Sequence, residues 1–212
     1  MSNMIQPPRR VIVYIDGFNL YFGLRDMQWK NCYWLDYPRF ASVLTKNITD
    51  SILVNTKYFT ARIKSPQDKA KRQSNYLDAL ELRGNIQIIP GDYKEEKFNC
   101  SGCGRINFIQ KEKQTDVGIA VELMMDAYRD NFDVAILISG DSDLIPAIKA
   151  VKEIDNKKQI IACFPPKRHS KEIRGLASGQ IHINEVDLRN CQLPDKITAK
   201  NGYVIKRPEQ WK

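Results

Sequence analysis

The chain has 212 residues, 42% of them hydrophobic, which fits one compact domain with one core. No apolar run approaches the roughly 20 residues that a spanning helix needs, so the sequence excludes a membrane-embedded protein. The formal net charge of +8 favours polyanionic partners, of which nucleic acid is the commonest, although a merely basic enzyme would show the same balance.

The N-terminal residues MSNMIQPPRR contain no apolar stretch, so they do not predict a signal peptide, and we expect a cytoplasmic protein. Five scattered cysteines do not indicate a disulfide framework. Cys100 and Cys103 form a C-x₂-C pair, but no second pair supplies the four ligands of structural zinc. We therefore expect a reduced or redox-sensitive pair there, and no zinc.

The first half of the chain alternates apolar runs with helical patterns. Residues 10–15 (RVIVYI), 51–63 and 85–91 predict strands. Helices are predicted at 18–27, 37–45 and 65–84. For the last of these, Ser65 is the expected N-cap, Pro66 the first helical residue and Gly84 the end.

The second half begins with a break in the pattern, because residues 92–112 predict a solvated hairpin with the tip CSGCG. A strong helix follows at 115–130, in which one apolar face gathers Val117, Ala120, Val121, Met124 and Tyr128. Strands at 132–139, 158–164 and 180–183 then alternate with helices at 143–154 and 170–178, and Pro146 is tolerated in the first turn of the former.

The predicted strands are continuously apolar, which is typical of a parallel sheet covered on both faces. The fold class is therefore α/β, a three-layer α/β/α sandwich with a mainly parallel sheet and an inserted hairpin. We assign residues 1–186 to this domain and residues 187–212 to a C-terminal tail. Asn201-Gly202 predicts a hairpin in the tail, which we expect to pack on the domain surface or on a partner.

Acidic side chains fall where the predicted strands end. Asp16 directly follows the first strand, Asp141 and Asp143 follow the strand at 132–139, and Asp116 lies in the first turn of its helix. Ligands of open parallel sheets bind beyond the carboxyl ends of the strands. Because clustered carboxylates repel one another unless a cation neutralises them, and oxygen ligands favour Mg²⁺ or Mn²⁺, we predict a shared metal site.

Each of these residues also has a structural interpretation. Helix capping and the helix dipole account for Asp116 and Asp143 but, in this interpretation, not for two aspartates that end hydrophobic strands. Asn19, three residues after Asp16, either orients that carboxylate, holds a phosphate oxygen, or is a plain helix residue.

Three blocks in this order and spacing resemble the signature of the NYN domain family and most of all its LabA-like branch: YIDGFNLY (14–21), KQTDVGIAVEL (113–123) and LISGDSDLIPAI (137–148). The resemblance covers about residues 9–186, and the tail is also similar to that of bacterial members. It implies a PIN-like fold and a ribonuclease that uses Mg²⁺ or Mn²⁺. It also implies that Asp16, Asp116 and Asp141 bind the metal, with Asp143 a fourth candidate and Asn19 an accessory ligand.

Basic residues near the predicted strand ends could bind the phosphates of single-stranded or structured RNA, or could simply be solvated. They are Arg62, Lys64, Lys111, Lys113, Lys167, Arg168 and Lys171. Phe18, Tyr21 and Phe59 could stack unpaired bases, or pack in the core.

Two other functions are compatible with the sequence. A phosphomonoesterase of the haloacid-dehalogenase type needs Asp-x-Asp after its first strand, and here Phe18 occupies the second position. A non-catalytic RNA-binding or regulatory module would retain the pocket without turnover. Whatever the function, the hairpin and the tail are candidate contacts of a homodimer.

Overall fold

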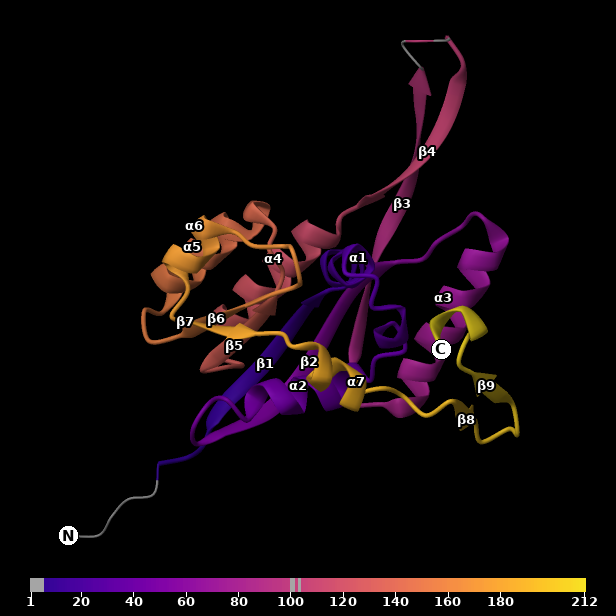
Figure 1. Cartoon of the computed structure of the whole chain (residues 1–212). Helices are drawn as coiled ribbons and strands as arrows, with labels where there is room; N and C mark the ends of the chain where they lie inside the picture. The colour runs from indigo at the N-terminus through magenta and orange to yellow at the C-terminus, as the bar shows by residue number, and fades with distance from the viewer. Residues whose placement is uncertain (1–5, 100–101, 103) are drawn as a thin grey trace, which may run out of the picture.

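The computed structural model describes residues 6–99, 102 and 104–212, without the side chains of residues 94–96, 98 and 106–112. Over this part of the chain, seven strands form one sheet in the order β4-β3-β2-β1-β5-β6-β7. Six of them run parallel, and β4 pairs antiparallel with β3. Helices lie on both sides of the sheet, which confirms the predicted α/β sandwich (Figure 1).

The strands follow the predicted apolar runs. Those of the main sheet are β1 (Arg9–Asp16), β2 (Ser51–Ala61), β3 (Gln87–Asn99), β4 (Ile106–Lys113), β5 (Val134–Ile138), β6 (Gln159–Phe164) and β7 (Gly179–His182). A separate pair in the tail is formed by β8 (Lys196–Thr198) and β9 (Val204–Lys206).

Six of the seven helices that the structure describes fall close to predicted ranges, and the last, α7, was not predicted. They are α1 (Gly17–Asp26), α2 (Tyr37–Thr45), α3 (Gln67–Arg83), α4 (Thr115–Tyr128), α5 (Ile145–Ile154), α6 (Lys171–Leu176) and α7 (Glu185–Asn190). Short 3₁₀ turns are η1 (Lys30–Cys32), η2 (Ser142–Leu144) and η3 (Glu209–Trp211). Within the described chain, none of these helices has the length and apolar character needed to cross a bilayer.

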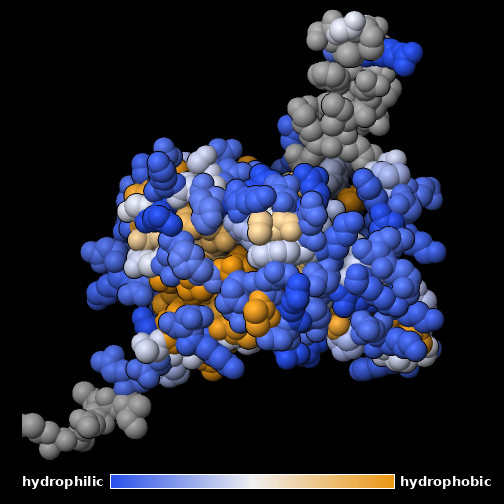
Figure 2. Space-filling model, in the orientation of Figure 1, coloured by the Kyte–Doolittle hydropathy of each residue, from blue (hydrophilic) through white to orange (hydrophobic). Residues whose placement is uncertain are grey.

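The sheet separates two apolar cores. Val13 and Ile15 of β1 point into the core that α1, α2, α3 and α7 cover, whereas Ile12 and Tyr14 point into the one beneath α4 and α5. Both faces of the central strands are therefore buried, which explains their continuous apolar sequence. The first face is less covered at β6 and β7, where Ile161 is only partly buried and Figure 2 shows apolar surface.

The expected inner face of α4 is only partly correct: Ala120 and Met124 are partly buried against the second core, but the other three residues face outward. Val117, Val121 and Tyr128 are 65%, 47% and 76% exposed, whereas Ile119 and Leu123 are fully buried. The helix is apolar on nearly every side, so two stripes compete in the sequence. The true inner stripe was hidden because it contains a charged residue, Asp126, that is buried against the sheet.

The start of α3 differs from the prediction by one position. Pro66 occupies the N-cap with an extended backbone, and the helix begins at Gln67. Ser65 is therefore not the capping residue, and no side chain caps this helix.

The predicted hairpin is present, but it is continuous with the sheet and not a separate insertion. β3 extends to Asn99 and pairs with β4 from Asp92, opposite Lys113, to Asn99, opposite Ile106. Figure 1 shows this pair projecting from the body of the molecule. The C-x₂-C prediction falls on Cys100 and Cys103, which lie outside the described residues.

The C-terminal tail packs on the domain. β8 and β9 form the predicted hairpin around Asn201-Gly202, with Gly202 at a φ of +84°. Leu193 and Ile205 are 3% and 2% exposed and belong to the first core. The indole of Trp34 also donates a hydrogen bond to the carbonyl of Pro194, at 2.9 Å. The tail thus completes the α3 side of the molecule.

Candidate functional site

Asp16 is the last residue of β1, and its side chain is held in place from two sides. It is 3% exposed and caps α1, because its Oδ1 accepts a hydrogen bond from the backbone N of Asn19 at 2.9 Å. Its Oδ2 accepts a second one from the hydroxyl of Ser139, at 2.8 Å. A carboxylate fixed in this way has a defined orientation at the carboxyl end of the central strand.

Ser139, which the sequence interpretation missed, joins two turns of the chain. Its Oγ also accepts a hydrogen bond from the backbone N of Asp141 at 3.0 Å, so one hydroxyl links Asp16 to Asp141. Beside it, the side-chain oxygen of Asn19 accepts from the backbone N of Gly140 at 3.0 Å. The signal was the position of Ser139 at the end of an apolar strand, directly before GDSD.

Asn19 therefore orients Asp16 through its backbone N–H. One prediction had assigned this role to the side-chain amide of Asn19. The amide ties α1 to the turn after β5. Gly140 in that turn leaves no room for a side chain, because a Cβ there would lie 2.3 Å from the carbonyl oxygen of Arg168. The two strand ends are consequently locked to each other and to the loop after β6.

Asp141 is the N-cap of η2, and its Oδ1 accepts a hydrogen bond from the backbone N of Asp143 at 2.9 Å. Asp143 itself is exposed. The argument that capping cannot explain Asp16 and Asp141 is therefore wrong, since both cap the helices that follow them. An ionised carboxylate can accept about four hydrogen bonds or ligands through its two oxygens, so these bonds do not by themselves prevent Asp16 or Asp141 from binding a ligand.

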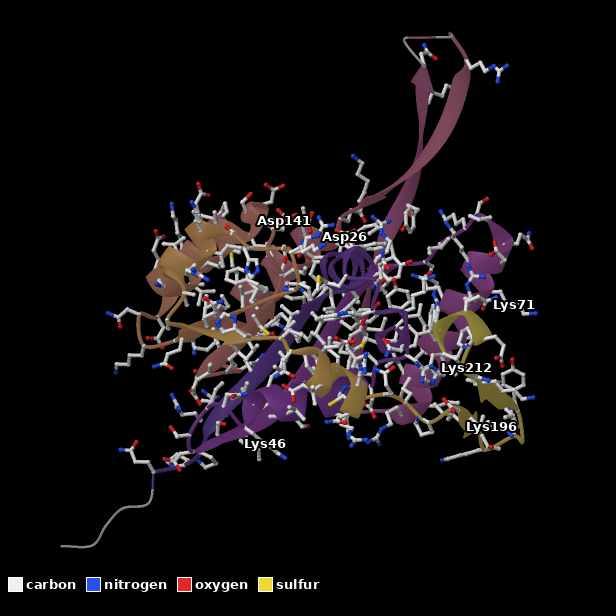
Figure 3. All side chains as sticks on the ribbon, in the orientation of Figure 1. Asp26, Lys46, Lys71, Asp141, Lys196 and Lys212 are labelled. Atoms are coloured by element: carbon white, nitrogen blue, oxygen red, sulfur yellow. The ribbon has the colours of Figure 1, made fainter. Side chains whose placement is uncertain are left out.

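Asp116, which the sequence could not place, lies at the same edge of the sheet, in the first turn of α4. Its pKa is raised above its usual value, first by burial and then by the charges of Asp141 and Asp143. The structure thus brings carboxylates from α4 and η2 within electrostatic range of one another. Figure 3 shows Asp141 beside this end of the sheet, with α1 next to it.

The donor set fits a hard divalent cation in its chemistry. Four carboxylates and one amide offer only oxygen ligands, the type that Mg²⁺ and Mn²⁺ prefer. In the ligand-free geometry of the described residues, however, no three Asp, Glu, His or Cys side chains form a ready-made group that could hold a metal ion. A Mg²⁺ ion usually keeps several waters and needs only one or two carboxylates from the protein, together with substrate phosphates.

The predicted basic residues are mostly engaged with acidic neighbours. Arg168 pairs with Asp26 at the end of α1, at 2.5 Å, and Lys167 donates to the carbonyl of the same Asp26, at 3.1 Å. Arg62 and Lys64 make longer contacts with Glu81 (3.8 Å) and Asp92 (3.5 Å). Lys64 and Arg62 are more than half exposed and could exchange these partners for phosphates.

For the remaining three basic residues, the structure describes the position in the fold. Lys113 and Lys171 are exposed, the first at the end of β4 before Asp116 and the second at the start of α6. Lys111 lies on β4, and its side chain is outside the described part of the chain. Their role in binding phosphate stays a prediction.

Of the three aromatic residues that could stack bases or pack in the core, Phe59 packs in the core. It is fully buried in the second core, with its ring stacked 6.5 Å from that of Tyr14. Phe18 and Tyr21 are partly exposed and line a cavity beside the acids.

The NYN domain profile matches residues 10–184. The chain belongs to the NYN domain family. This confirms the resemblance found in the three sequence blocks, and it places the chain in the PIN-like nuclease superfamily.

Two curated proteins are similar to this NYN chain. The 6-hydroxy-3-succinoylpyridine 3-monooxygenase HspA of Pseudomonas putida (strain DSM 28022 / S16) is 28% identical over 244 residues, covering 96% of this chain and 76% of HspA. The low amplitude and bright protein LabA of Synechococcus elongatus (strain ATCC 33912 / PCC 7942 / FACHB-805) is 24% identical, covering 84% and 86%. The likeness to LabA supports the LabA-like branch.

Among solved structures, a Vibrio parahaemolyticus RIMD 2210633 protein of unknown function is similar, with a TM-score of 0.57 and 19% identity. The alignment covers 87% of this chain and 97% of that one. At this identity the likeness supports the fold alone.

Proposed function

We propose that this NYN protein is a metal-dependent ribonuclease whose acidic edge holds Mg²⁺ or Mn²⁺. The observation that carries the proposal is the meeting of carboxylates at the carboxyl end of the sheet. Asp116 is partly buried beside Asp141 and Asp143, and Ser139 links Asp141 to Asp16. Like charges are gathered there at an energetic cost that a bound cation removes.

Each residue of this edge then has a role. Asp16 and Asp141 are the oriented ligands, because backbone and hydroxyl hydrogen bonds fix their positions. Asp116 and the exposed Asp143 complete the set, and one of these acids accepts a proton from the attacking water. A bound divalent ion supplies the rest of the chemistry, polarising the phosphodiester and stabilising the leaving oxygen.

RNA is the proposed substrate, because the charge of +8 and the exposed cations at the strand ends suit a polyanion. The exposed lysines come from three places in the fold: Lys64 from the loop between β2 and α3, Lys113 from the end of β4, and Lys171 from the start of α6. Phosphate contacts of this kind position a strand without reading its sequence.

Cleavage of a labelled single-stranded RNA with Mn²⁺, Mg²⁺ or EDTA tests this function. The wild type should cut with either metal and not with EDTA, and Asp141→Asn should lose at least about 100-fold of the rate, since even partners behind a metal ligand contribute about 10- to 100-fold. Asparagine caps a helix as well as aspartate does, so the variant should fold normally.

The matched control is Asp50→Asn, which makes the same change at an exposed aspartate directly before β2, at the amino end of that strand and away from the acidic edge. This control should cut like the wild type. Cleavage by Asp141→Asn at the wild-type rate, or cleavage that persists in EDTA, would contradict the proposal. Binding of RNA without any turnover would instead favour a non-catalytic module.

A second candidate is oxidation of a small pyridine ring, as the name of the HspA relative describes. It is favoured by the alignment, which covers nearly the whole chain, and by the aromatic cavity next to the acids. Oxygen consumption with a hydroxypyridine and a reduced nicotinamide or flavin donor separates this candidate from a nuclease. We expect none above the background of the donor alone.

A further inference from the structure

A cavity of about 330 Å³ lies beside α1. It is bounded by α1, the end of β2, the start of α3 and the C-terminal turn η3. Ligand pockets in proteins begin at about this volume. Figure 3 labels Asp141 and Lys71, which lie on opposite sides of α1 in that view, Lys71 on α3.

The floor of the cavity consists of buried tyrosines. Tyr37, Tyr58 and Tyr76 are each 5% exposed, and the rings of Tyr37 and Tyr58 lie 4.4 Å apart. Burial raises the pKa of all three hydroxyls, so they keep their protons. The hydroxyl of Tyr76 donates to the carbonyl of Leu35, at 2.7 Å. The floor thus combines apolar rings with neutral hydrogen-bonding groups.

The walls present further aromatic rings to the space. Tyr21 is 41% exposed and packs 5.1 Å from Tyr33, which in turn meets Trp211 edge-on at 5.9 Å. On another side, Phe18 meets Tyr93 at 5.8 Å. Planar rings bind well between such side chains, because stacking depends on the aromatic face and tolerates any base.

The charged groups of the cavity are all basic. Arg25, Lys69 and Arg72 are among the described lining residues, and no Asp or Glu is. Arg72 also pairs with Asp68 at 2.8 Å, while Lys69 is exposed. A planar ligand that carries a negative group complements this arrangement.

The cavity shares a wall with the acidic edge. Gly17 lines the cavity and directly follows Asp16 in the chain. A Cβ at Gly17 would lie 2.6 Å from the ring of Tyr58 and 2.6 Å from the carbonyl oxygen of Phe59. The backbone at Gly17 therefore packs directly against the floor of the cavity. We infer that one ligand can occupy the cavity with one part and reach the acidic edge with the adjacent part.

We propose that this cavity binds the base of one unpaired nucleotide, with phosphate groups at its basic rim, next to the bond that the acidic edge cleaves. The choice of a nucleotide rests on the proposed ribonuclease function. A small hydroxypyridine with an anionic tail has similar chemistry, and the experiment below distinguishes the two.

The test is a titration of the 212-residue protein with adenosine and cytidine 5′-monophosphates in EDTA. Binding is measured by tryptophan fluorescence and by calorimetry. We expect saturable binding that perturbs the fluorescence, because Trp211 lies at the cavity. Tyr21→Ala should weaken it about 5- to 150-fold, the range that the loss of one stacking ring produces. Tyr128→Ala, which truncates a 76% exposed tyrosine outside the cavity, should bind like the wild type.

The same titration on Asp141→Asn separates this proposal from the proposed activity. Unchanged nucleotide binding in that variant supports a cavity that is distinct from the acids, whether or not the wild type cleaves RNA. Absence of nucleotide binding, equal binding by Tyr21→Ala, or equally tight binding of inorganic phosphate alone would each overturn the proposal. Binding of a hydroxypyridine carboxylate without any binding of nucleotides would overturn it in favour of a small ring ligand.

Discussion

Two groups of acidic residues lie on this sheet, and they differ in how their charges are compensated. Beneath α4, Asp126 accepts hydrogen bonds from Lys57 at 2.5 Å, Tyr14 at 2.6 Å and Asn131 at 2.9 Å. Burial alone would raise the pKa of Asp126, but these bonds outweigh burial and lower it. At the carboxyl edge, Asp116 has a raised pKa, because its burial is reinforced by Asp141 and Asp143.

The difference teaches how to separate a structural carboxylate from a functional one. Asp126 sits in a complete network in which Lys57 also pairs with Glu122, at 2.6 Å, so its charge is already balanced by the chain. The carboxyl edge is instead held together by hydrogen bonds that orient carboxylates without neutralising them. Only the second group gains from an added cation.

Lys57→Met should have the largest effect on stability. It leaves the carboxylates of Asp126 and Glu122 buried or half-buried without their cation, so the free energy of unfolding should fall by about 3–5 kcal/mol. Urea unfolding measures this change, with the exposed Lys149→Met as a control expected within about 0.5 kcal/mol of the wild type. A loss below about 1 kcal/mol would mean that the network contributes little.

Lowering the pH should remove the contribution of Asp126 to the free energy of unfolding. Its folded pKa lies below the usual value of about 3.9, so its stabilisation is present above that pH and is lost as the pH falls through the lowered value. Wild type and Asp126→Asn should therefore differ in unfolding free energy at pH 6 and converge on acidification to about pH 2. A difference that stays constant with pH would contradict this interpretation.

Asp116→Asn should act in the opposite direction, and its effect should be the smallest. Removing one of the repelling charges at the carboxyl edge should raise the free energy of unfolding of the metal-free protein by about 0.5 kcal/mol, while cleavage is lost. Thermal unfolding in EDTA, compared with an RNA cleavage assay, reveals both effects. Destabilisation by this variant would show that Asp116 is a structural residue.

Much of the fold was predictable because the strand and helix patterns are local. Residues 37–45 form α2 as predicted, and the three-layer class followed from continuously apolar strands. The face of α4 was not predictable, since its inner stripe includes Asp126, whose partner Lys57 lies 69 residues earlier in the chain. Long-range compensation of this kind leaves no local pattern.

The candidate site was predictable in part for the same reason. Asp16 and Asp141 could be placed because they end strands of a parallel sheet, whose carboxyl ends meet at one edge. Their roles as helix caps and the link through Ser139 depend on side-chain geometry. The aromatic cavity was out of reach, because Tyr21 and Trp211 come from opposite ends of the chain.

Titration of Mn²⁺ into the metal-free protein, followed by calorimetry, tests the central claim most directly. The wild type should bind Mn²⁺, and so should Asp126→Asn at a temperature where that variant is folded, since Asp126 belongs to the compensated group. Asp141→Asn should bind at least 10- to 100-fold more weakly. Absence of binding in the wild type, or equal binding by Asp141→Asn, would contradict the claim that the carboxyl edge is a cation site.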